Sequence, residues 1–433
     1  MNKPLWHYHP AKNWINDPNG LCQVDGVYHM YYQYNPGSDL WGDIHWGHAT
    51  SRDLLHWKEL SPAMQPAHYL GEEHCFSGGC CKDENGQPHF FYTSIGSRKE
   101  GRDARFGPQQ WHAEPDGSLN RLRQTNENAL TLDLHGDMEV LEWRDPCVIR
   151  YGGQYLMVLG GCAEGHGCVL LYTSPDMQRW TYRDILAQSE KADGVTWECP
   201  NLLEVDGHFV LLYSPCGPVM ARVGLLDEEL HFRTVSECLL EPGAWNGYYA
   251  PQCFIDESGR AILFGWMPEC DHAHKGWSGV MTLPRVMHVQ DGQLVLQPLD
   301  TLHTLAQQEL PLPCTAESVM VRARFSASAL PLTLVLCASP DGREQTLLTL
   351  GVDGTLTCDR SRSTLTDGPE KTPVARIVRI DKESNELLAI ADCGALEIMV
   401  NGAWLSARVY PSLAESTGVR LDSHVPIEAT AFI

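Results

Sequence analysis

The sequence lacks any apolar stretch near the roughly 20 residues that a membrane-spanning helix requires. The first ten residues, MNKPLWHYHP, also lack the apolar core of a signal peptide, so we expect a cytoplasmic protein that does not enter a membrane. Basic residues are scarce: 32 Lys and Arg stand against 55 Asp and Glu, and the formal net charge is −23. This charge disfavours nucleic acid and anionic lipid as partners, and we expect a neutral ligand.

Closely spaced cysteine pairs are also missing. Sixteen cysteines are present, yet no Cys-x-x-Cys occurs, and Cys80 and Cys81 are the one adjacent pair. Structural zinc sites need such pairs, so we interpret the cysteines as reduced thiols that pack as small core residues. Histidines form three close pairs: His7 and His9, His45 and His48, and His272 and His274. None is accompanied by a carboxylate-rich third segment, so we predict no metal site.

Long helical periodicity is hard to find in residues 1–290, where a turn motif recurs instead. The turns are Asp25-Gly26, Asn85-Gly86, Gly152-Gly153, Asp206-Gly207 and Ser258-Gly259. Each is followed by a short apolar or aromatic run, such as VYHMYYQY or HFVLLYS, which predicts a β-hairpin. The turn glycines are 60, 67, 54 and 52 residues apart. Each interval is long enough for one four-stranded unit with its loops. We therefore predict an all-β fold that begins with a five-bladed β-propeller.

Three acids, Asp17, Asp145 and Glu198, stand eight or nine residues before these turn glycines. Ser77 and Ala250 hold the matching positions in the other two units. The innermost strand of each propeller blade lines the central channel, so the repeat predicts that the acids converge. Taken singly, each acid could cap a turn or pair with a neighbouring arginine, but three like charges close together raise one another's pKa and are costly as structure. Glycoside hydrolysis uses such paired carboxyl groups.

Beyond residue 297 the pattern changes. LDTLHTLAQQ (Leu299 to Gln308) predicts a short helix, and LPLPC predicts a stiff linker because proline cannot continue a helix. Alternating runs such as VMVRARF and LEIMVNG then predict an antiparallel β-sandwich. We divide the chain into a catalytic propeller (residues 1–297), a linker with a short helix (298–313) and a β-sandwich (314–433). For the sandwich we expect a role in packing or in forming a homo-oligomer, rather than in binding carbohydrate.

Seven segments between about residues 5 and 290 form an ordered set: WINDPNG, YYQYNPGSDLWGDIHWGHATSRDLLHW, FSGG, WRDP, WECPNL, YYAPQ and GWSGVMTLPR. In this order they resemble glycoside hydrolase family 32, the β-fructofuranosidases. CDRSRS (Cys358 to Ser363) and ALEIMVNG (Ala395 to Gly402) more weakly resemble the family's C-terminal sandwich. The resemblance implies a five-bladed propeller followed by a β-sandwich, and hydrolysis with retention of configuration through a covalent fructosyl-enzyme.

By this resemblance, Asp17 would be the nucleophile, Glu198 the acid and base, and Asp145 the residue that holds fructose hydroxyls and stabilises the transition state. The two carboxyl groups of a retaining pair are expected to lie about 5 Å apart. The pocket for the terminal fructose would be lined by Asn16, Gln33, Trp41, Phe76, Ser77, Arg144 and Trp266. No metal or organic cofactor is implied, and the expected partner is a neutral fructose-containing oligosaccharide.

The fifth unit departs from the family pattern. Many bacterial members carry an acid just before the aromatic-Tyr-Ala segment, where this chain reads WNGYYAPQ. Gly247 stands in that place, with Asn246 beside it and Glu241 further back. Because this region contacts the sugar beyond the cleaved bond in the family, the change weakens the expectation that sucrose is the best substrate. We hypothesise a preference for short fructans or other fructose-terminated oligosaccharides.

Other functions also fit parts of this pattern. A five-bladed glycosidase that cleaves arabinan or xylan would use three acids too, although WINDPNG and HWGHATS argue against it. Within the family, a sucrose-6-phosphate hydrolase or a fructosyltransferase would carry the same acids, but no cluster of Lys or Arg suggests a phosphate site. A catalytically silent sugar-binding propeller would need a defect elsewhere, for example at Gly247.

Overall fold

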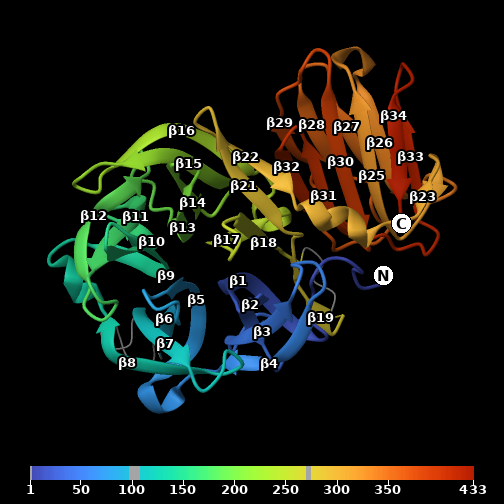
Figure 1. The fold of residues 1–433 in the computed structure, drawn as a ribbon. Helices are drawn as coiled ribbons and strands as arrows, with labels where there is room; N and C mark the ends of the chain where they lie inside the picture. Colours follow the sequence, from blue (N-terminus) through green and yellow to red (C-terminus); the bar gives the residue numbers. More distant parts are fainter. Residues whose placement is uncertain (1, 97–107, 270–274) are drawn as a thin grey trace.

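Two β-domains lie side by side in the computed structural model, which describes residues 2–96, 108–269 and 275–433 (Figure 1). Within these residues, the N-terminal domain has five mainly antiparallel sheets around a common centre, and the C-terminal domain has two six-stranded sheets that share one core. The predicted fold class, a five-bladed propeller followed by an antiparallel sandwich, is confirmed. Among the described residues, helices are short, and none has the length and apolar character needed to cross a membrane.

The propeller sheets follow one another along the chain. Their strands are β1 (Asn13–Val24), β2 (Val27–Asn35), β3 (His45–Ser51), β4 (Lys58–Met64), β5 (Glu72–Lys82), β6 (Pro88–Gly96), β7 (Gln109–Pro115), β8 (Leu122–Leu130), β9 (Val140–Tyr151), β10 (Gln154–Ala163), β11 (His166–Ser174), β12 (Thr181–Gln188), β13 (Glu198–Val205), β14 (His208–Ser214), β15 (Val219–Leu226), β16 (Phe232–Glu241), β17 (Tyr249–Ile255), β18 (Ala261–Met267), β19 (Trp277–Ser278), β20 (Val280–Met281), β21 (Arg285–Gln290) and β22 (Gln293–Pro298). Three 3-10 helices lie between them: η1 (His68–Leu70), η2 (Leu132–His135) and η3 (Ala244–Asn246).

Each predicted hairpin turn joins the first two strands of one sheet. The first strands of the five sheets, β1, β5, β9, β13 and β17, contact one another in a closed ring. The ring is also closed by β19, which lies in the chain between β18 and β20 of the fifth sheet and pairs in parallel with β1, Asn13 opposite Trp277. Gly279 is required there, because its φ is +88° and a Cβ would lie 2.1 Å from the carbonyl oxygen of Ile15.

All five first strands carry a β-bulge at the same depth. In each, two residues face one residue of the next strand, between the paired residues Ile15 and Pro18, Cys75 and Gly78, Arg144 and Cys147, Glu198 and Asn201, and Tyr249 and Gln252. A bulge turns side chains out of the regular alternation, and here it directs them to the channel. The bulges correct one prediction, since the three acids do not occupy equivalent positions.

Asp17 is the second residue of its bulge, Asp145 is the first of its bulge, and Glu198 is the paired residue before a bulge. The prediction used the distance of each acid from its turn glycine, and this distance does not reveal where the acid stands relative to the bulge. The stretch between bulge and turn varies in length from sheet to sheet, and β1 contains a second register shift.

The sandwich begins earlier than its predicted boundary. Its strands are β23 (Glu309–Leu310), β24 (Cys314–Thr315), β25 (Ser318–Phe325), β26 (Leu332–Ala338), β27 (Thr346–Leu350), β28 (Thr355–Asp359), β29 (Val374–Ile377), β30 (Asn385–Asp392), β31 (Ala395–Val400), β32 (Ala403–Arg408), β33 (Gly418–Asp422) and β34 (Glu428–Phe432). The predicted short helix is the 3-10 helix η4 (Asp300–Leu305), and η5 (Ala327–Ala329) lies within the sandwich. Because β23 pairs with β34, the end of the predicted linker belongs to a sandwich sheet.

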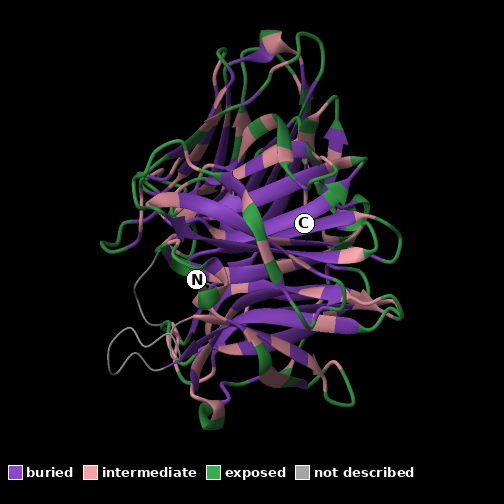
Figure 2. Ribbon diagram, turned by 90° about the vertical axis from the view of Figure 1, so that its left-hand side faces the viewer, coloured by how far each residue is buried: buried purple, intermediate pink, exposed green. Residues whose placement is uncertain are grey.

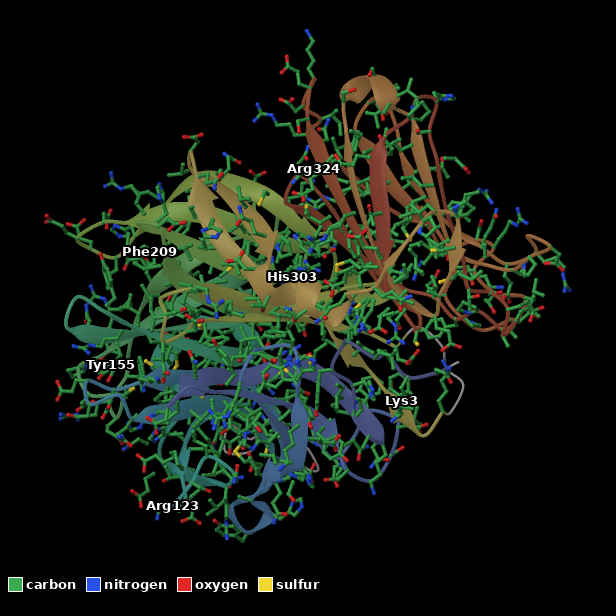
Figure 3. All side chains as sticks on the ribbon, turned by 45° about the vertical axis from the view of Figure 1, so that its right-hand side comes forward. Lys3, Arg123, Tyr155, Phe209, His303 and Arg324 are labelled. Atoms are coloured by element: carbon green, nitrogen blue, oxygen red, sulfur yellow. The ribbon has the colours of Figure 1, made fainter. Side chains whose placement is uncertain are left out.

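Buried side chains run through the strands of both domains, and exposed ones gather in the connections (Figure 2). The largest apolar cluster joins the propeller to the sandwich and includes Leu302 of η4 and Trp404 of β32. His303 of the same helix lies near the border of the two domains (Figure 3). The domain interface is thus a continuous core, which fixes the sandwich against the propeller.

A buried ionic network crosses this interface. The Arg285 guanidinium lies 2.8 Å from Glu241 Oε1 and 2.6 Å from Glu397 Oε2, and all three side chains are fully buried. His7 contacts Glu397 at 3.0 Å through Nε2 and Asp392 at 2.8 Å through Nδ1. Glu241, noted in the sequence as the acid behind Gly247, therefore belongs to the interface.

Candidate active site

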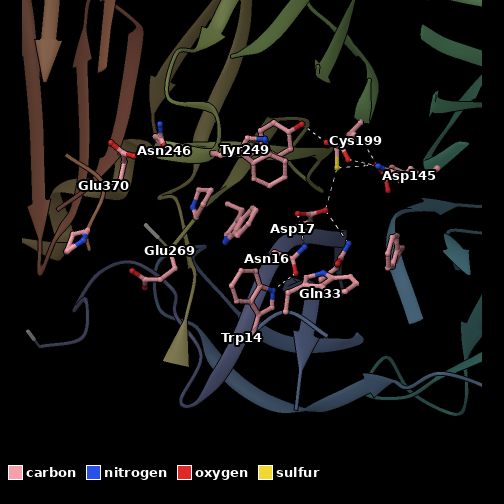
Figure 4. Close-up of a pocket in the computed structure, with 18 of the residues that line it drawn as sticks. Trp14, Asn16, Asp17, Gln33, Asp145, Cys199, Asn246, Tyr249, Glu269 and Glu370 are labelled. Atoms are coloured by element: carbon pink, nitrogen blue, oxygen red, sulfur yellow. Dashed lines mark hydrogen bonds and ion pairs between the residues drawn. The ribbon is translucent and has the colours of Figure 1, made fainter. Parts of the chain in front are cut away.

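A cavity of about 630 Å³ lies where the first strands of the propeller meet, and it extends to the sandwich (Figure 4). Its lining is Trp14, Asn16, Asp17, Gln33, Trp41, Phe76, Arg144, Asp145, Glu198, Cys199, Trp245, Asn246, Tyr249, Trp266, Pro268, Glu269, Gly368, Pro369, Glu370 and Lys371. Nine of the ten predicted site residues are in this set. The tenth, Ser77, lies behind Asp17 and hydrogen-bonds to it.

Asp17 sits in the bulge of β1 and is held by three of the predicted residues. Its Oδ2 accepts hydrogen bonds from Ser77 Oγ at 2.6 Å and Gln33 Nε2 at 3.2 Å, and its Oδ1 accepts one from Asn16 Nδ2 at 3.0 Å. Burial raises the pKa of this carboxyl group, and the nearby Glu198 adds to the rise. The bonds from Ser77 and Asn16 favour the ionised form and limit the increase.

Glu198 begins β13 and has a partner on each carboxylate oxygen. Arg144 donates to Oε1 at 2.7 Å, and the Tyr249 hydroxyl donates to Oε2 at 2.5 Å. A second nitrogen of Arg144 binds Glu142 at 2.5 Å. Although burial opposes the charge on Arg144, its acidic neighbours outweigh burial and raise its pKa, so it remains a cation. Arg144 and Tyr249 together fix the direction of the Glu198 carboxyl group.

Asp145 is buried beside the other two acids. Its Oδ2 accepts a hydrogen bond from the backbone N–H of Cys199 at 2.9 Å. The Cys199 thiol lies 3.5 Å from Asp145 Oδ2 and 3.6 Å from Asp17 Oδ2, and so links the two carboxyl groups (Figure 4). Burial, opposed by Arg144 and reinforced by Asp17 and Glu198, raises the pKa of Asp145 to about 7. Near neutral pH the cluster therefore holds a proton that can be exchanged.

Aromatic rings form one wall of the cavity. Trp245 stacks on Tyr249 with ring centroids 4.0 Å apart, and Trp266 meets Trp14 and Trp245 edge to face at 5.8 and 5.9 Å. Trp266 is thus part of the cavity lining. Of these rings, Trp14, Trp245 and Tyr249 were missed as site residues, although the YYAPQ segment that holds Tyr249 occupies the fifth-blade position that matches the start of β13.

Trp41 and Phe76 also line the cavity and meet edge to face at 6.1 Å. Trp41 is half exposed, in keeping with a position at the mouth of the cavity. Flat apolar faces beside a cluster of carboxyl, amide and guanidinium groups suit a sugar, which offers apolar ring faces and a rim of hydroxyls.

The sandwich also contributes to the lining of the cavity, in addition to the packing role expected for it. Gly368 to Lys371, between β28 and β29, form part of the lining. A loop carries no periodic pattern, and its place beside a blade some 120 residues earlier depends on how the two domains pack. The sequence held no signal for this contribution.

Two histidine pairs lie away from the cavity. One of them, with a nearby glutamate, has the ligand types of a metal site, but the fold explains both pairs as packing contacts. His89 and His112 lie 3.0 Å apart, next to Glu114. His29 and His48 form the same stacked pair, 2.9 Å apart, at the equivalent positions of the first sheet. This repetition between neighbouring blades, without an acid in the first, favours packing over metal binding. The histidines predicted as a pair at 272 and 274 lie outside the described residues.

Comparisons with known proteins point to one family. The family model for the "Glycosyl hydrolases family 32 N-terminal domain" matches residues 7–298, and that for "Glycosyl hydrolases family 32 C terminal" matches residues 294–430. Sucrose-6-phosphate hydrolase of Escherichia coli is 28% identical over 97% of this chain and 93% of its own length.

Two solved structures share the fold. Sucrose-6-phosphate hydrolase of Lactobacillus gasseri superposes with a TM-score of 0.86 at 23% identity, over 99% of this chain and 92% of that chain. Fructan 1-exohydrolase IIa of Cichorium intybus, in complex with 1-kestose, superposes with a TM-score of 0.84 at 22% identity. The superposition covers 99% of this chain and 97% of that chain. Matches to both family models across nearly the whole chain show that the protein belongs to glycoside hydrolase family 32 and is a glycoside hydrolase of the fructosidase type.

Proposed function

We propose that the protein is a retaining hydrolase that releases terminal β-D-fructofuranosyl units from fructo-oligosaccharides, short fructans or sucrose. The observation that carries this proposal is the convergence of Asp17, Asp145 and Glu198 on one aromatic-walled cavity. Cys199 links the first two acids, and Arg144 and Tyr249 orient the third.

In the first step, Glu198 donates a proton to the glycosidic oxygen as the bond to the anomeric carbon breaks. A carboxylate oxygen of Asp17 forms a bond to that carbon, and the leaving sugar departs with the proton. The Glu198 carboxylate then takes a proton from a water molecule, whose oxygen attacks the anomeric carbon and releases Asp17. Two inversions give net retention of configuration.

The surrounding residues have matching tasks. Ser77, Gln33 and Asn16 hold the Asp17 carboxylate in one direction, which brings it closer to the geometry for attack. Asp145 accepts hydrogen bonds from fructose hydroxyls, and its bond to the Cys199 N–H keeps it in place. Since an oxocarbenium-like transition state is positive, ionised carboxyl groups around it stabilise it.

Fructose release from sucrose, 1-kestose, inulin and levan tests this proposal. We expect the native chain to release fructose from at least one of them, with 1-kestose preferred over sucrose. Asp17→Ala is expected to abolish turnover while leaving the unfolding temperature nearly unchanged. Equal, negligible rates for the native chain and the variant would instead support a sugar-binding propeller. A large loss of thermal stability in the variant would point to a structural role for Asp17 as a turn cap.

A phosphorylated disaccharide is the second candidate substrate, because relatives from Escherichia coli and Lactobacillus gasseri are named sucrose-6-phosphate hydrolases. The same assay with sucrose 6-phosphate separates the candidates. A kcat/KM at least tenfold above that for sucrose and 1-kestose would favour the phosphorylated substrate.

A further inference from the structure

The cavity is longer than the group of catalytic acids. At one end Asp17 and Asp145 lie beside Cys199, and at the other end Glu370 and Asn246 lie close together, with Tyr249 between the two ends (Figure 4). Because the fructosyl unit to be cleaved must contact Asp17, the far end lies on the side of the leaving group.

The fifth-blade turn at this end packs directly on the sandwich. A Cβ on Gly247 would lie 2.1 Å from the carbonyl oxygen of Ser406 in β32. No larger residue fits there without moving one domain from the other. Glu370, from the sandwich loop, brings a carboxyl group to the same cavity.

Arg360, in the CDRSRS segment, joins the two sides of this end. It is fully buried and donates to the carbonyl oxygens of Asn246 at 3.1 Å, Arg408 at 2.9 Å and Thr372 at 2.9 Å. Asn246 lines the cavity from the propeller, and Thr372 directly follows the sandwich residues that line it. One guanidinium thus sets the distance between the η3 turn and the sandwich loop.

The groups at this end suit a neutral sugar. Trp245 presents a half-exposed ring, stacked on Tyr249, on which a second sugar ring can lie. The Thr372 backbone N–H donates to Glu370 Oε1 at 2.6 Å, and hydrogen bonds from Thr372 lower the pKa of Glu370, so it is an ionised acceptor for hydroxyl groups. The Lys371 ammonium is held by the carbonyl oxygen of Thr366 at 2.7 Å.

Charge around the cavity disfavours a phosphate. Among the described residues that line it, five carry carboxyl groups and two are basic. Of the two basic residues, Arg144 already binds Glu142 and Glu198. A phosphate dianion would therefore enter a region of like charge.

We propose that the sandwich loop Gly368–Lys371 and the propeller turn at Trp245 and Asn246, held together by Arg360, form a leaving-group subsite that selects neutral saccharides over phosphorylated ones. This inference rests on the proposed function. It assigns a specificity role to Glu370 and Trp245 and a positioning role to Arg360.

Four substrates with different leaving groups test the subsite: 1-kestose, sucrose, sucrose 6-phosphate and methyl β-D-fructofuranoside. The methanol released from the last is too small to reach Glu370. We expect wild-type kcat/KM for sucrose to exceed that for sucrose 6-phosphate at least tenfold. Glu370→Gln should lower kcat/KM for 1-kestose about tenfold and change it less than twofold for the methyl fructoside. Trp245→Ala should lower kcat/KM about tenfold more for 1-kestose than for the methyl fructoside, because its ring also stacks on Tyr249. Glu383→Gln, on an exposed sandwich glutamate, is the matched control and should leave kcat/KM unchanged for both 1-kestose and the methyl fructoside.

Arg360→Met should raise KM for 1-kestose about tenfold, with kcat for the methyl fructoside unchanged. Arg360→Lys keeps the charge and should raise KM less. Should the methionine variant fail to fold, the lysine variant carries the test, and a KM equal to that of the wild type would then overturn the role of Arg360.

Two results would overturn the subsite: preferred hydrolysis of sucrose 6-phosphate, or equal losses on 1-kestose and methyl fructoside in the Glu370 and Trp245 variants. If the wild type releases fructose from none of the four, the proposed function fails, and binding becomes the test. Calorimetry of 1-kestose with Asp17→Ala should then show about tenfold weaker binding when Glu370→Gln is added. Equal affinities would contradict the subsite by itself.

Discussion

The Tyr249 hydroxyl donates a hydrogen bond of 2.5 Å to Oε2 of Glu198, across the junction of the fifth and fourth sheets. Both residues are the last paired positions before the bulges of their strands, so the propeller repeat itself brings them together. Tyr249 also accepts a hydrogen bond from the backbone N–H of Cys216 at 3.0 Å, which fixes the ring oxygen. A residue of the neighbouring blade, Tyr249, therefore orients the carboxyl group of Glu198.

Tyr249→Phe removes this hydroxyl and keeps the ring that stacks on Trp245. We expect kcat on 1-kestose to fall about tenfold with little change in KM, because one charge-assisted hydrogen bond that orients Glu198 is lost. Steady-state kinetics measure both constants, and the unfolding temperature serves as the control for folding. An unchanged kcat would show that Arg144 alone orients the acid.

The nucleophile gives a prediction for pH dependence. Burial raises the pKa of Asp17, and the bond from Ser77 lowers it. Asp17 must be ionised to attack, so activity falls as pH drops through its pKa. Ser77→Ala removes a bond that favours the ionised form, and the acidic limb of the kcat/KM profile should move to higher pH by several tenths of a pH unit or more. A limb at the same pH in both proteins would contradict the assignment of Asp17.

The repeat in the sequence made the propeller predictable, because a turn and an apolar run mark each hairpin independently of loop length. It also brought Asp17, Asp145 and Glu198 to one channel. Their different places relative to the bulges could not be predicted, since a bulge depends on pairing between strands and leaves no pattern in one strand. Tyr249 was missed for this reason. It holds the same position relative to its bulge as Glu198 does, whereas Asp145 lies within its own bulge.

The sandwich could be predicted as a fold and not as part of the site. Its strands alternate in sequence, whereas the place of Glu370 depends on how two complete domains pack. The sequence singled out Gly247, but the contact that leaves no room for a side chain there, with the carbonyl oxygen of Ser406, comes from a residue far away in sequence. Contacts of this kind become visible once coordinates are known.

Asp145 links activity to stability. Its pKa is about 7 in the folded protein, above the ordinary 3.8, so the folded state binds more protons than the unfolded state between those values. Stability should therefore fall as pH rises from about 4 to 7. Asp145→Asn should lose activity. The difference in unfolding temperature, variant minus wild type, should increase by several degrees between pH 4 and pH 8. Calorimetry across this range checks the prediction, and a constant difference would contradict it.

The buried interface network should give stability a second dependence on pH, through His7. Burial opposes its charge, but hydrogen bonds to Asp392 and Glu397 outweigh burial and raise the pKa of His7 to about 9. Compared with the ordinary 6.5, this corresponds to about 3 kcal/mol of stabilisation, which is fully present below pH 6.5 and lost as pH rises through 9.

His7→Gln should therefore lower the unfolding temperature at pH 6 and weaken its decline between pH 6.5 and 9.5. His303→Gln, on an exposed histidine of η4, should leave the wild-type profile unchanged. Because His7 joins the N-terminal segment to the sandwich, the variant should also raise KM for 1-kestose more than for methyl β-D-fructofuranoside if domain packing sets the leaving-group side. Parallel stability profiles for the wild type and His7→Gln would show that His7 is not charged in the folded protein.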